Sequence, residues 1–217
     1  MIANADILLD EPGFVVANKP SGMLSEGGAD REIDLEQFVS TLVGRQVWCC
    51  HRLDRLTSGL VVLRKGKRYL KELSSQFESR SVRKEYWLLV DGVWDHRIQK
   101  VDSLIAPVGG GVHANVLEGG KSATSTFQLR GVDEVQRISW LRGLLKTGRT
   151  HQLRLHTLMS GCPVLGDPVY GKSRADGLFG LHAFRLKMRH PGTGEALDFE
   201  ADIPENWRPL IAKFEAS

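Results

Sequence analysis

Asp54 is the one carboxylate in a stretch of chain that is otherwise basic and apolar. It lies in CCHRLDRLTSGLVVLRKGKR, residues 49 to 68, with Arg52 and Arg55 close on either side. Nearby positive charge favours the ionised form of a carboxyl group. An ionised aspartate in a loop can act as a nucleophile or as a general base. The alternative is a salt-bridged aspartate that caps a turn, and this segment alone leaves both interpretations open.

The histidines and cysteines are the candidate metal ligands, and their spacing argues against a metal site. His151 and His156 are five residues apart, whereas the HExxH helix has its two histidines four apart, and no third ligand pattern accompanies them. Cys49, Cys50 and Cys162 contain no CxxC spacing, so they indicate neither a zinc site nor a disulfide framework. We therefore expect no metal ion and three reduced thiols.

Short apolar runs indicate the strands that must position these residues. Three of them are mainly apolar or β-branched, a fourth alternates apolar with polar side chains, and a fifth also resembles a strand. They cover residues 14–18, 60–64, 86–90, 123–130 and 138–145.

Three helices are expected between these strands. Asp34 is suited to cap the first helix, with Gln37 at the reciprocal capping position. The second helix should turn Leu70, Leu73 and Phe77 inward and its lysines and arginines outward. The third should run from about residue 150 to residue 160, with a glycine as its stop.

The balance of elements predicts the fold class. Many strands, few helices and glycine clusters such as VGGGVHANVLEGGK favour an α+β fold built on a largely antiparallel sheet with flanking helices. A chain of 217 residues fits one domain, and neither an internal repeat nor a Ser/Pro-rich linker divides it. We therefore expect a single domain over residues 1–217.

Composition places the protein among ordinary globular chains. The hydrophobic fraction is 41% and the charged fraction 25%, which excludes a disordered or fibrous protein. No apolar run approaches the roughly 20 residues that span a bilayer. The first residues, MIANADILLDEPGF, lack the basic and apolar regions of a secretory signal. These features predict a cytoplasmic protein that does not enter the membrane.

Positive charge is concentrated in two segments, although the net charge is only +3. Residues 52–84 hold ten Lys or Arg against three acids, and residues 137–174 hold seven against one. If the two segments share a face, that face would suit a polyanion. The alternative is two solvated faces, which charge alone does not exclude.

Five motifs occur together in one order along the chain. They are NKPSG (18–22), HRLDRLTSGL (51–60), RKEYWLLV (83–90), LLKTGRTHQLRLHTLMSGCPVLGDPVYG (144–171) and LHAFRLKMRHP (181–191). In this order and at these spacings the set resembles the RluA family of pseudouridine synthases. The resemblance covers nearly the whole chain, and the combination of HRLDRLTSGL with TGRTHQLRLH is its most specific part.

The resemblance implies a reaction and a catalytic set. Such enzymes isomerise uridine in RNA by cutting the N1–C1′ bond, turning the uracil and rejoining it through C5, without a cofactor. Asp54 matches the catalytic aspartate, which either adds to C1′ or removes a proton from C2′. Arg149 matches the arginine that pairs with it, and a guanidinium suits this role because it stays charged and bonds bidentately. Tyr86 matches the tyrosine that stacks on the target base.

The resemblance also implies contacts with RNA. Arg52 matches an arginine thought to fill the gap that an extruded nucleotide leaves. Arg55, Lys19 and Arg154 are further candidates, although Lys19 could shape a turn and Arg154 could be a solvated charge. The expected partner is a stem-loop of transfer RNA or of large-subunit ribosomal RNA, bound by a monomer that lacks the S4-type domain of larger members.

Two other functions are considered beside this one. A catalytically silent RNA-binding module would use the same basic residues, but Asp54, Tyr86 and Arg149 argue against it. A nucleoside or glycoside hydrolase would need paired carboxylates, and only Asp54 has a motif around it.

Overall fold

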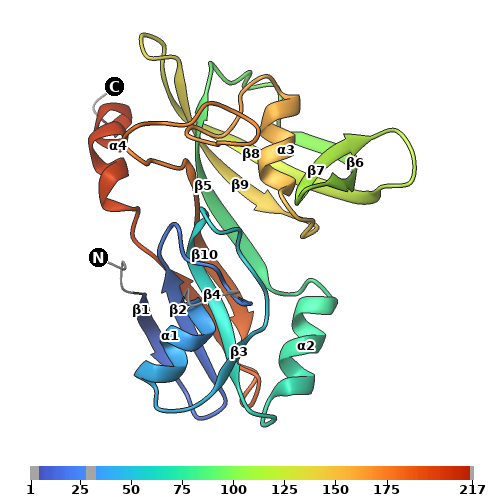
Figure 1. Cartoon of the computed structure of the whole chain (residues 1–217), viewed down its shortest axis with the longest axis vertical. Coiled ribbons are helices and arrows are strands. Elements are labelled where there is room, and N and C mark those ends of the chain that lie inside the picture. Colours follow the sequence, from blue (N-terminus) through green and yellow to red (C-terminus); the bar gives the residue numbers. More distant parts are fainter. Residues whose placement is uncertain (1–4, 28–32, 216–217) are drawn as a thin grey trace. The chain divides into compact units, whose positions relative to one another are not determined.

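The structure is a computed structural model that describes residues 5–27 and 33–215. The chain forms two compact units. The first comprises Met1–Lys84 and Ala183–Asp202, and the second comprises Glu85–His182 and Ile203–Ser217. Two strands, β5 (Arg83–Asp91) and β10 (Leu181–Arg189), begin in one unit and end in the other (Figure 1).

The first unit is built on a sheet in which the β1–β2, β2–β4, β3–β4 and β10–β11 pairs are antiparallel. Its strands lie in the order β1-β2-β4-β10, with β3 also paired to β4 and β11 also paired to β10. The new elements are β1 (Asp6–Asp10), β2 (Phe14–Lys19), β3 (Val47–Cys49), β4 (Ser58–Lys65) and β11 (Ala196–Glu200). The register sets Lys19 opposite Gly59, so the end of β2 lies beside the start of β4.

Two helices belong to this unit. Helix α1 (Leu35–Leu42) begins where the Asp34 carboxylate accepts the backbone N–H of Gln37 over 2.9 Å, which satisfies a donor that the first helical turn leaves unpaired. Helix α2 (Leu70–Glu78) turns Leu73 into the core. The core around it consists of Phe14, Val16, Leu60, Val62, Leu73, Val82, Leu186 and Met188.

The second unit contains another antiparallel run of strands, in the order β5-β9-β8-β6-β7. Their bounds are β6 (Lys100–Gly109), β7 (Val112–Val116), β8 (Lys121–Asp133) and β9 (Ile138–Leu145). The turn between β6 and β7 consists of glycines at positive φ, a backbone conformation that glycine adopts without steric cost.

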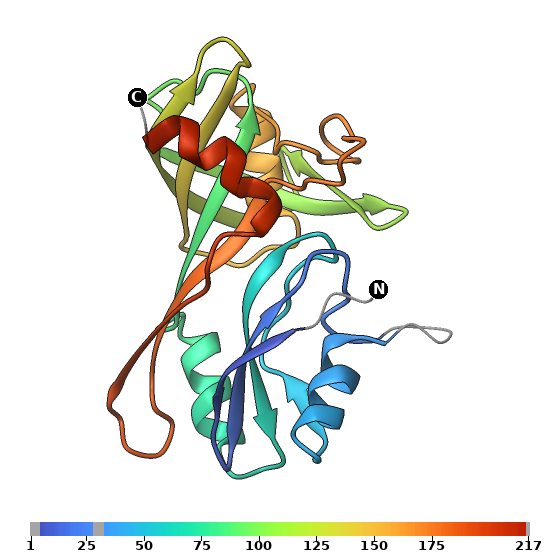
Figure 2. The ribbon, with the colours of Figure 1, turned by 90° about the vertical axis from the view of Figure 1, so that its left-hand side faces the viewer.

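The helices of the second unit pack on these strands. Helix α3 (Gln152–Met159) lies against β6, β7 and β8. A 3₁₀ turn (Glu205–Trp207) leads into α4 (Arg208–Glu215), which crosses the strands of this unit in Figure 2 and packs on β8. Trp207 and Ile211 join a buried cluster with Leu89, Ile138, Leu165 and Leu178.

The α+β class, the five expected strands and the three expected helices are all confirmed. One orientation was wrong: Leu70 is 40% exposed instead of facing inward, because it is the first residue of α2 and Leu73 takes the core position. No helix within residues 5–27 and 33–215 is long and apolar enough to cross a membrane.

Candidate functional site

Asp54 lies in the turn that leads directly into β4, and its side chain is half-buried. Consecutive carbonyl groups of this turn all accept hydrogen bonds. Asp54 O accepts from Thr57 N over 3.0 Å, and Leu56 O accepts from the Ser21 hydroxyl over 2.6 Å. The Ser25 hydroxyl donates to Leu53 O over 3.0 Å and accepts from Leu53 N over 3.1 Å. The backbone around Asp54 is therefore fixed by residues of the segment that follows β2.

Lys19 makes the central contacts of this turn. Its side chain is fully buried, and Nζ donates to the carbonyl oxygens of Met23 (2.7 Å), Pro20 (3.1 Å) and Arg55 (3.1 Å). Burial lowers the pKa of this ammonium to about 7, and the negative charge of Asp54 partly offsets the decrease. Lys19 is thus a structural cation beside Asp54, which agrees with the turn-shaping alternative and not with an exposed RNA contact.

Gly59 allows β4 to start close to β10. A Cβ atom at this position would lie 2.3 Å from the carbonyl oxygen of Ala183, and φ is +115°, so no other residue fits without backbone movement. The turn at Asp54 is therefore followed at once by a strand whose position is fixed by backbone contact.

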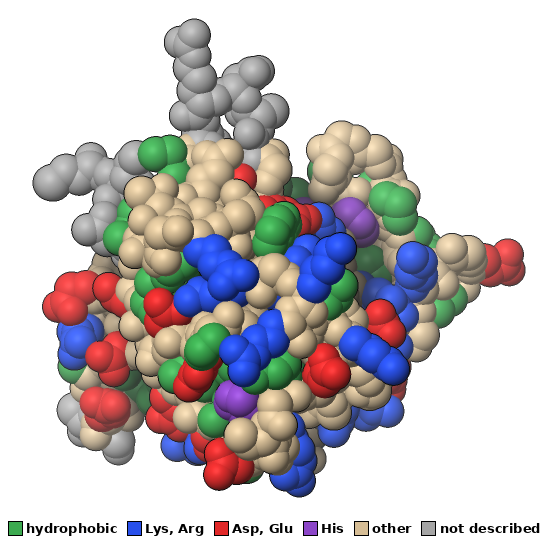
Figure 3. Space-filling view, turned by 90° about the horizontal axis from the view of Figure 1, so that it is seen from below, with side chains coloured by type: hydrophobic (Ala, Val, Ile, Leu, Met, Phe, Trp, Pro, Cys, Tyr) green, Lys and Arg blue, Asp and Glu red, His purple; other side chains and the backbone are tan. Residues whose placement is uncertain are grey.

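Arg52 and Arg55 flank Asp54 and are both exposed. The Arg52 side chain is 67% exposed and pairs with Glu26 over 3.0 Å, a contact that solvent screens. Both arginines remain accessible to an anion. On the face shown in Figure 3, Lys and Arg side chains stand among Asp and Glu side chains, so that face carries charge of both signs.

Tyr86 lies on β5 in the second unit, opposite Gly143 of β9, and is 5% exposed. The strand is anchored next to it by the buried Glu85, whose carboxylate accepts from Arg142 Nε over 2.9 Å. This ion pair and the β9 ladder hold the part of the strand that carries Tyr86.

Arg149 lies in the turn between β9 and α3 and is half-buried. Its backbone N–H donates to Gln152 Oε1 over 3.0 Å, and its side-chain Nε donates to the carbonyl oxygen of Ser122 over 3.0 Å. The backbone and the base of the guanidinium are thus both held. Asp54 belongs to the first unit, whereas Tyr86 and Arg149 belong to the second.

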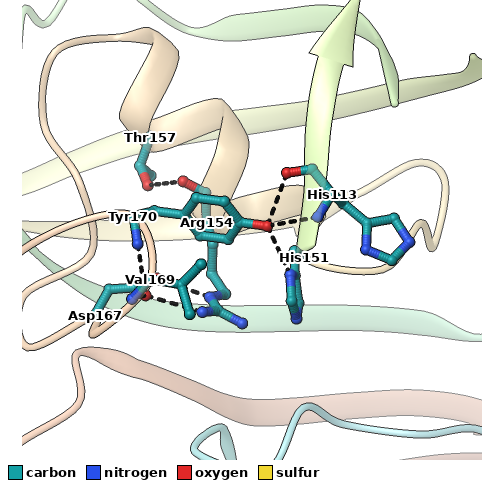
Figure 4. Close-up of polar contacts among 7 residues, drawn as sticks. All are labelled: His113, His151, Arg154, Thr157, Asp167, Val169 and Tyr170. Carbon is teal, nitrogen blue, oxygen red and sulfur yellow. Dashed lines mark hydrogen bonds and ion pairs between the residues drawn. The ribbon is translucent and has the colours of Figure 1, made fainter. Parts of the chain in front are cut away.

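Tyr170 connects the next residues of this turn to the β6–β7 hairpin. Its hydroxyl accepts from His113 N over 3.0 Å, donates to His113 O over 2.9 Å and lies 2.8 Å from His151 Nδ1, as Figure 4 shows. Since a hydroxyl has one proton, the third contact requires His151 to donate from Nδ1. His151 itself adopts a left-handed backbone, with φ of 58°.

Arg154 is buried and makes a bidentate ion pair with the fully buried Asp167 (Figure 4). Its Nε and Nη2 donate to the two carboxylate oxygens over 2.7 Å and 2.9 Å. Asp167 also accepts the backbone N–H groups of Val169 and Tyr170. Arg154 was predicted from the sequence as an RNA contact or a solvated charge, and its burial instead makes it a structural residue.

Two further histidines also have protein partners. His156 Nε2 lies 3.0 Å from the Ser103 hydroxyl, and burial lowers the His156 pKa to about 4. His51 Nε2 accepts the backbone N–H of Val62 over 3.2 Å, and its ring stacks on Phe77.

Several residues that position the site were not identified as such from the sequence. Glu85, Gln152, Asp167 and Tyr170 all lie inside the quoted motifs. Glu85 lies on β5 and Gln152 on α3, whereas Asp167 and Tyr170 lie in the segment between α3 and β10; the only available signal was that each belongs to a motif of the resemblance.

Residues 13–158 match the family model described as RNA pseudouridylate synthase. Ribosomal large subunit pseudouridine synthase C of Haemophilus influenzae is 30% identical over 225 residues, which cover 97% of this chain and 69% of that protein. The protein of the same name from Escherichia coli (strain K12) is 32% identical over 228 residues, covering 97% of this chain and 70% of that one.

Solved structures show the same fold. Human RNA Pseudouridylate Synthase Domain Containing 4 superposes with a TM-score of 0.75 at 24% identity, covering 96% of this chain and 92% of that one. Human RNA Pseudouridylate Synthase Domain Containing 1 gives a TM-score of 0.76 at 22% identity, covering 100% and 97%.

Proposed function

The chain belongs to the RNA pseudouridylate synthase family, and we propose that it converts uridine to pseudouridine in large-subunit ribosomal RNA with Asp54 as the catalytic group. The reaction is an isomerisation. The N1–C1′ bond breaks, the uracil turns, a C5–C1′ bond forms, and the proton on C5 leaves while N1 gains one. No atom is lost and no redox partner is needed.

Asp54 acts on the sugar in one of two ways in this proposal. Its carboxylate adds to C1′ as N1 leaves and is displaced when C5 attacks C1′, or it removes a proton from C2′ to give a glycal and returns that proton to C2′ when C5 attacks C1′. Both steps need an ionised carboxylate at a fixed position. The observation that carries the proposal is the turn itself, in which the carbonyl groups of residues 53–56 are all hydrogen-bonded around a half-buried aspartate. Preorganisation of this kind limits the motion of a catalytic group.

Arg149 and Tyr86 complete the proposed catalytic set. Arg149 pairs with Asp54 through its terminal guanidinium nitrogens, since Nε is already bound to Ser122. Tyr86 stacks on the uracil and helps to move the C5 proton. The support for both roles is their position in motifs of the family and the rigid elements that carry them. The whole of residues 1–217 then acts as one catalytic domain.

The RNA contacts proposed are Arg52 and Arg55, which are exposed beside Asp54. Arg52 fills the space of the extruded uridine, which must leave its stack for a carboxylate to reach the sugar. Lys19 and Arg154 are buried and support the loops instead. The names of the relatives, ribosomal large subunit pseudouridine synthases, support large-subunit ribosomal RNA as the target. A transfer RNA stem-loop is the second candidate target, and we propose that the protein acts as a monomer in the cytoplasm.

The test is single-turnover pseudouridine formation on a large-subunit ribosomal RNA transcript, with filter binding measured beside it. Asp54→Asn keeps the shape of the side chain and removes its charge. We expect the rate to fall by at least about 100-fold, with RNA affinity maintained. Asp198→Asn is the matched control, because Asp198 is a carboxylate in an exposed ion pair of the same unit, and it should keep the wild-type rate.

Loss of an essential catalytic group costs orders of magnitude in rate. If Asp54→Asn keeps more than about a hundredth of the wild-type rate, Asp54 is a structural turn residue. Binding without any product would indicate a silent RNA-binding module. Release of free uracil would indicate a hydrolase.

A further inference from the structure

Gln152 is a buried glutamine at the start of α3, and its side chain lies between the Arg149 turn and β8. It is 2% exposed. Its backbone N–H also donates to Arg149 O over 3.1 Å, so residues 149–152 form a turn closed by both backbone and side chain. The proposed mechanism does not use this residue.

Each hydrogen-bonding position of the Gln152 amide is occupied. Oε1 accepts from the Thr147 hydroxyl over 2.6 Å and from Arg149 N over 3.0 Å. Nε2 donates to Thr124 O and to Ser125 Oγ, both over 2.9 Å. A primary amide has two acceptor positions and two N–H groups, so the four contacts use all of them.

These contacts also fix which end of the amide faces which partner. If oxygen and nitrogen were exchanged, the NH₂ group would face the N–H of Arg149, and the oxygen would face the carbonyl of Thr124. Both contacts would be repulsive. The amide therefore has a single orientation, in which it holds the Arg149 backbone at a fixed distance from β8.

Neighbouring hydrogen bonds also connect the Arg149 turn to β8. The Thr147 hydroxyl accepts from Thr124 N over 2.9 Å, and Lys146 N donates to Thr124 O over 3.1 Å. Ser122, which accepts from Arg149 Nε, lies on the same strand, β8. Both the turn and Nε of the Arg149 side chain are thus hydrogen-bonded to β8.

We infer that Gln152 is a positioning residue for Arg149: its buried amide sets the position of the turn from which the guanidinium extends. The inference rests on the proposed role of Arg149. A displacement of about 1 Å in a catalytic constellation can cost roughly 100-fold in rate, and loss of this amide frees the turn on both sides.

The experiment compares Gln152→Leu, Arg149→Ala and the double variant in the single-turnover assay, with RNA affinity and the unfolding midpoint measured for each. We expect Gln152→Leu to lower the rate between 10-fold and about 100-fold while RNA affinity changes little. In the Arg149→Ala background, Gln152→Leu should lower the rate no further than about threefold, because both changes remove one function.

Gln76→Leu is the matched control. Gln76 also makes two side-chain bonds to backbone, with Arg189 N and O at 2.9 Å, but lies on α2 of the first unit. It should leave the rate unchanged. If Gln152→Leu fails to fold, Thr147→Val replaces it, because it removes one donor to the amide. It should lower the rate by a smaller factor, and it should not lower the rate further in the Arg149→Ala background.

A wild-type rate in Gln152→Leu, or an effect that multiplies with that of Arg149→Ala, would overturn the inference. A wild-type rate in Arg149→Ala would overturn the proposed role of Arg149 instead, and the inference with it. The two failures are therefore distinguishable.

Discussion

Replacement of Arg154 by methionine tests whether this residue supports the fold or binds RNA. Methionine keeps much of the length and apolar stem of the side chain but leaves Asp167 without its cation. That carboxylate is fully buried and would retain only the backbone N–H groups of Val169 and Tyr170. The variant therefore leaves an uncompensated negative charge in the interior.

The expected cost follows from that geometry. Breaking a buried ion pair by removal of one partner typically costs about 3 to 5 kcal/mol, which for a chain of this size is a decrease of roughly 10 °C in the unfolding midpoint. The deficit should also depend on pH. Burial alone would raise the pKa of Asp167, and the hydrogen bonds and charge of Arg154 hold it below its usual range.

The sign of the pH effect can be worked out from this shift. In the wild type, the lowered pKa contributes stability that is present above the unfolded pKa of about 4 and is lost as pH falls through the folded value. Without Arg154 the burial effect dominates, so the folded pKa rises above the unfolded one. The penalty is then relieved as pH falls, and the deficit should be smaller at pH 5 than at pH 7.

Tryptophan fluorescence during thermal unfolding is the assay, because Trp87, Trp94, Trp140 and Trp207 all lie in the second unit with Arg154. Arg97→Met, which removes an exposed partner of Asp95, is the control and should barely shift the midpoint. In Arg154→Met with Asp167→Asn, removal of the buried charge should recover part of the loss. An unchanged midpoint in Arg154→Met together with weaker, less salt-dependent RNA binding would refute the reasoning and make Arg154 an RNA contact.

Three more outcomes are expected. Because the Lys19 pKa is lowered to about 7, the unfolded chain binds more protons than the folded chain above that pH, so the free energy of unfolding should rise with pH from 7 toward 10. Lys19→Met should flatten this slope in urea titrations, and an unaltered slope would contradict the lowered pKa. If Arg52 and Arg55 contact phosphates, alanine at either position should lower the log-log salt slope of RNA binding by roughly 0.7 to 0.9, and an unchanged slope would exclude the contact. Full activity is expected in EDTA when a polyamine keeps the RNA folded, because His151 and His156 bond to Tyr170 and Ser103; recovery only with a transition metal would disprove it.

Local signals predicted much of the fold. Asp34 and Gln37 mark the start of α1 because capping involves neighbours in sequence. The division into two units left no such signal, since its boundaries run through β5 and β10 and not through a linker. Strand β10 carries Arg185 and Lys187 among apolar residues, and its pairing with distant strands is set by the tertiary fold.

The site was predictable where a side chain stood out chemically. Asp54 did so as the one acid in a basic run. For Lys19 the sequence left an RNA contact and a turn-shaping role open. Its partners are carbonyl oxygens, which every residue has and which no sequence pattern reveals. In α3, residues 152–157 are all buried, polar ones included, so no amphipathic stripe distinguished Gln152 or Arg154.

The path of the chain has a consequence for synthesis on the ribosome. The first unit needs Ala183–Asp202 to be complete, yet Glu85–His182 emerges in between. Until β10 arrives, the early part of β4 has an open edge beside Gly59, in the strongly apolar sequence SGLVVLRK. Unpaired apolar edges are where nascent chains associate wrongly. The interval before residue 183 is made is therefore the stage at which a chaperone would be of most use.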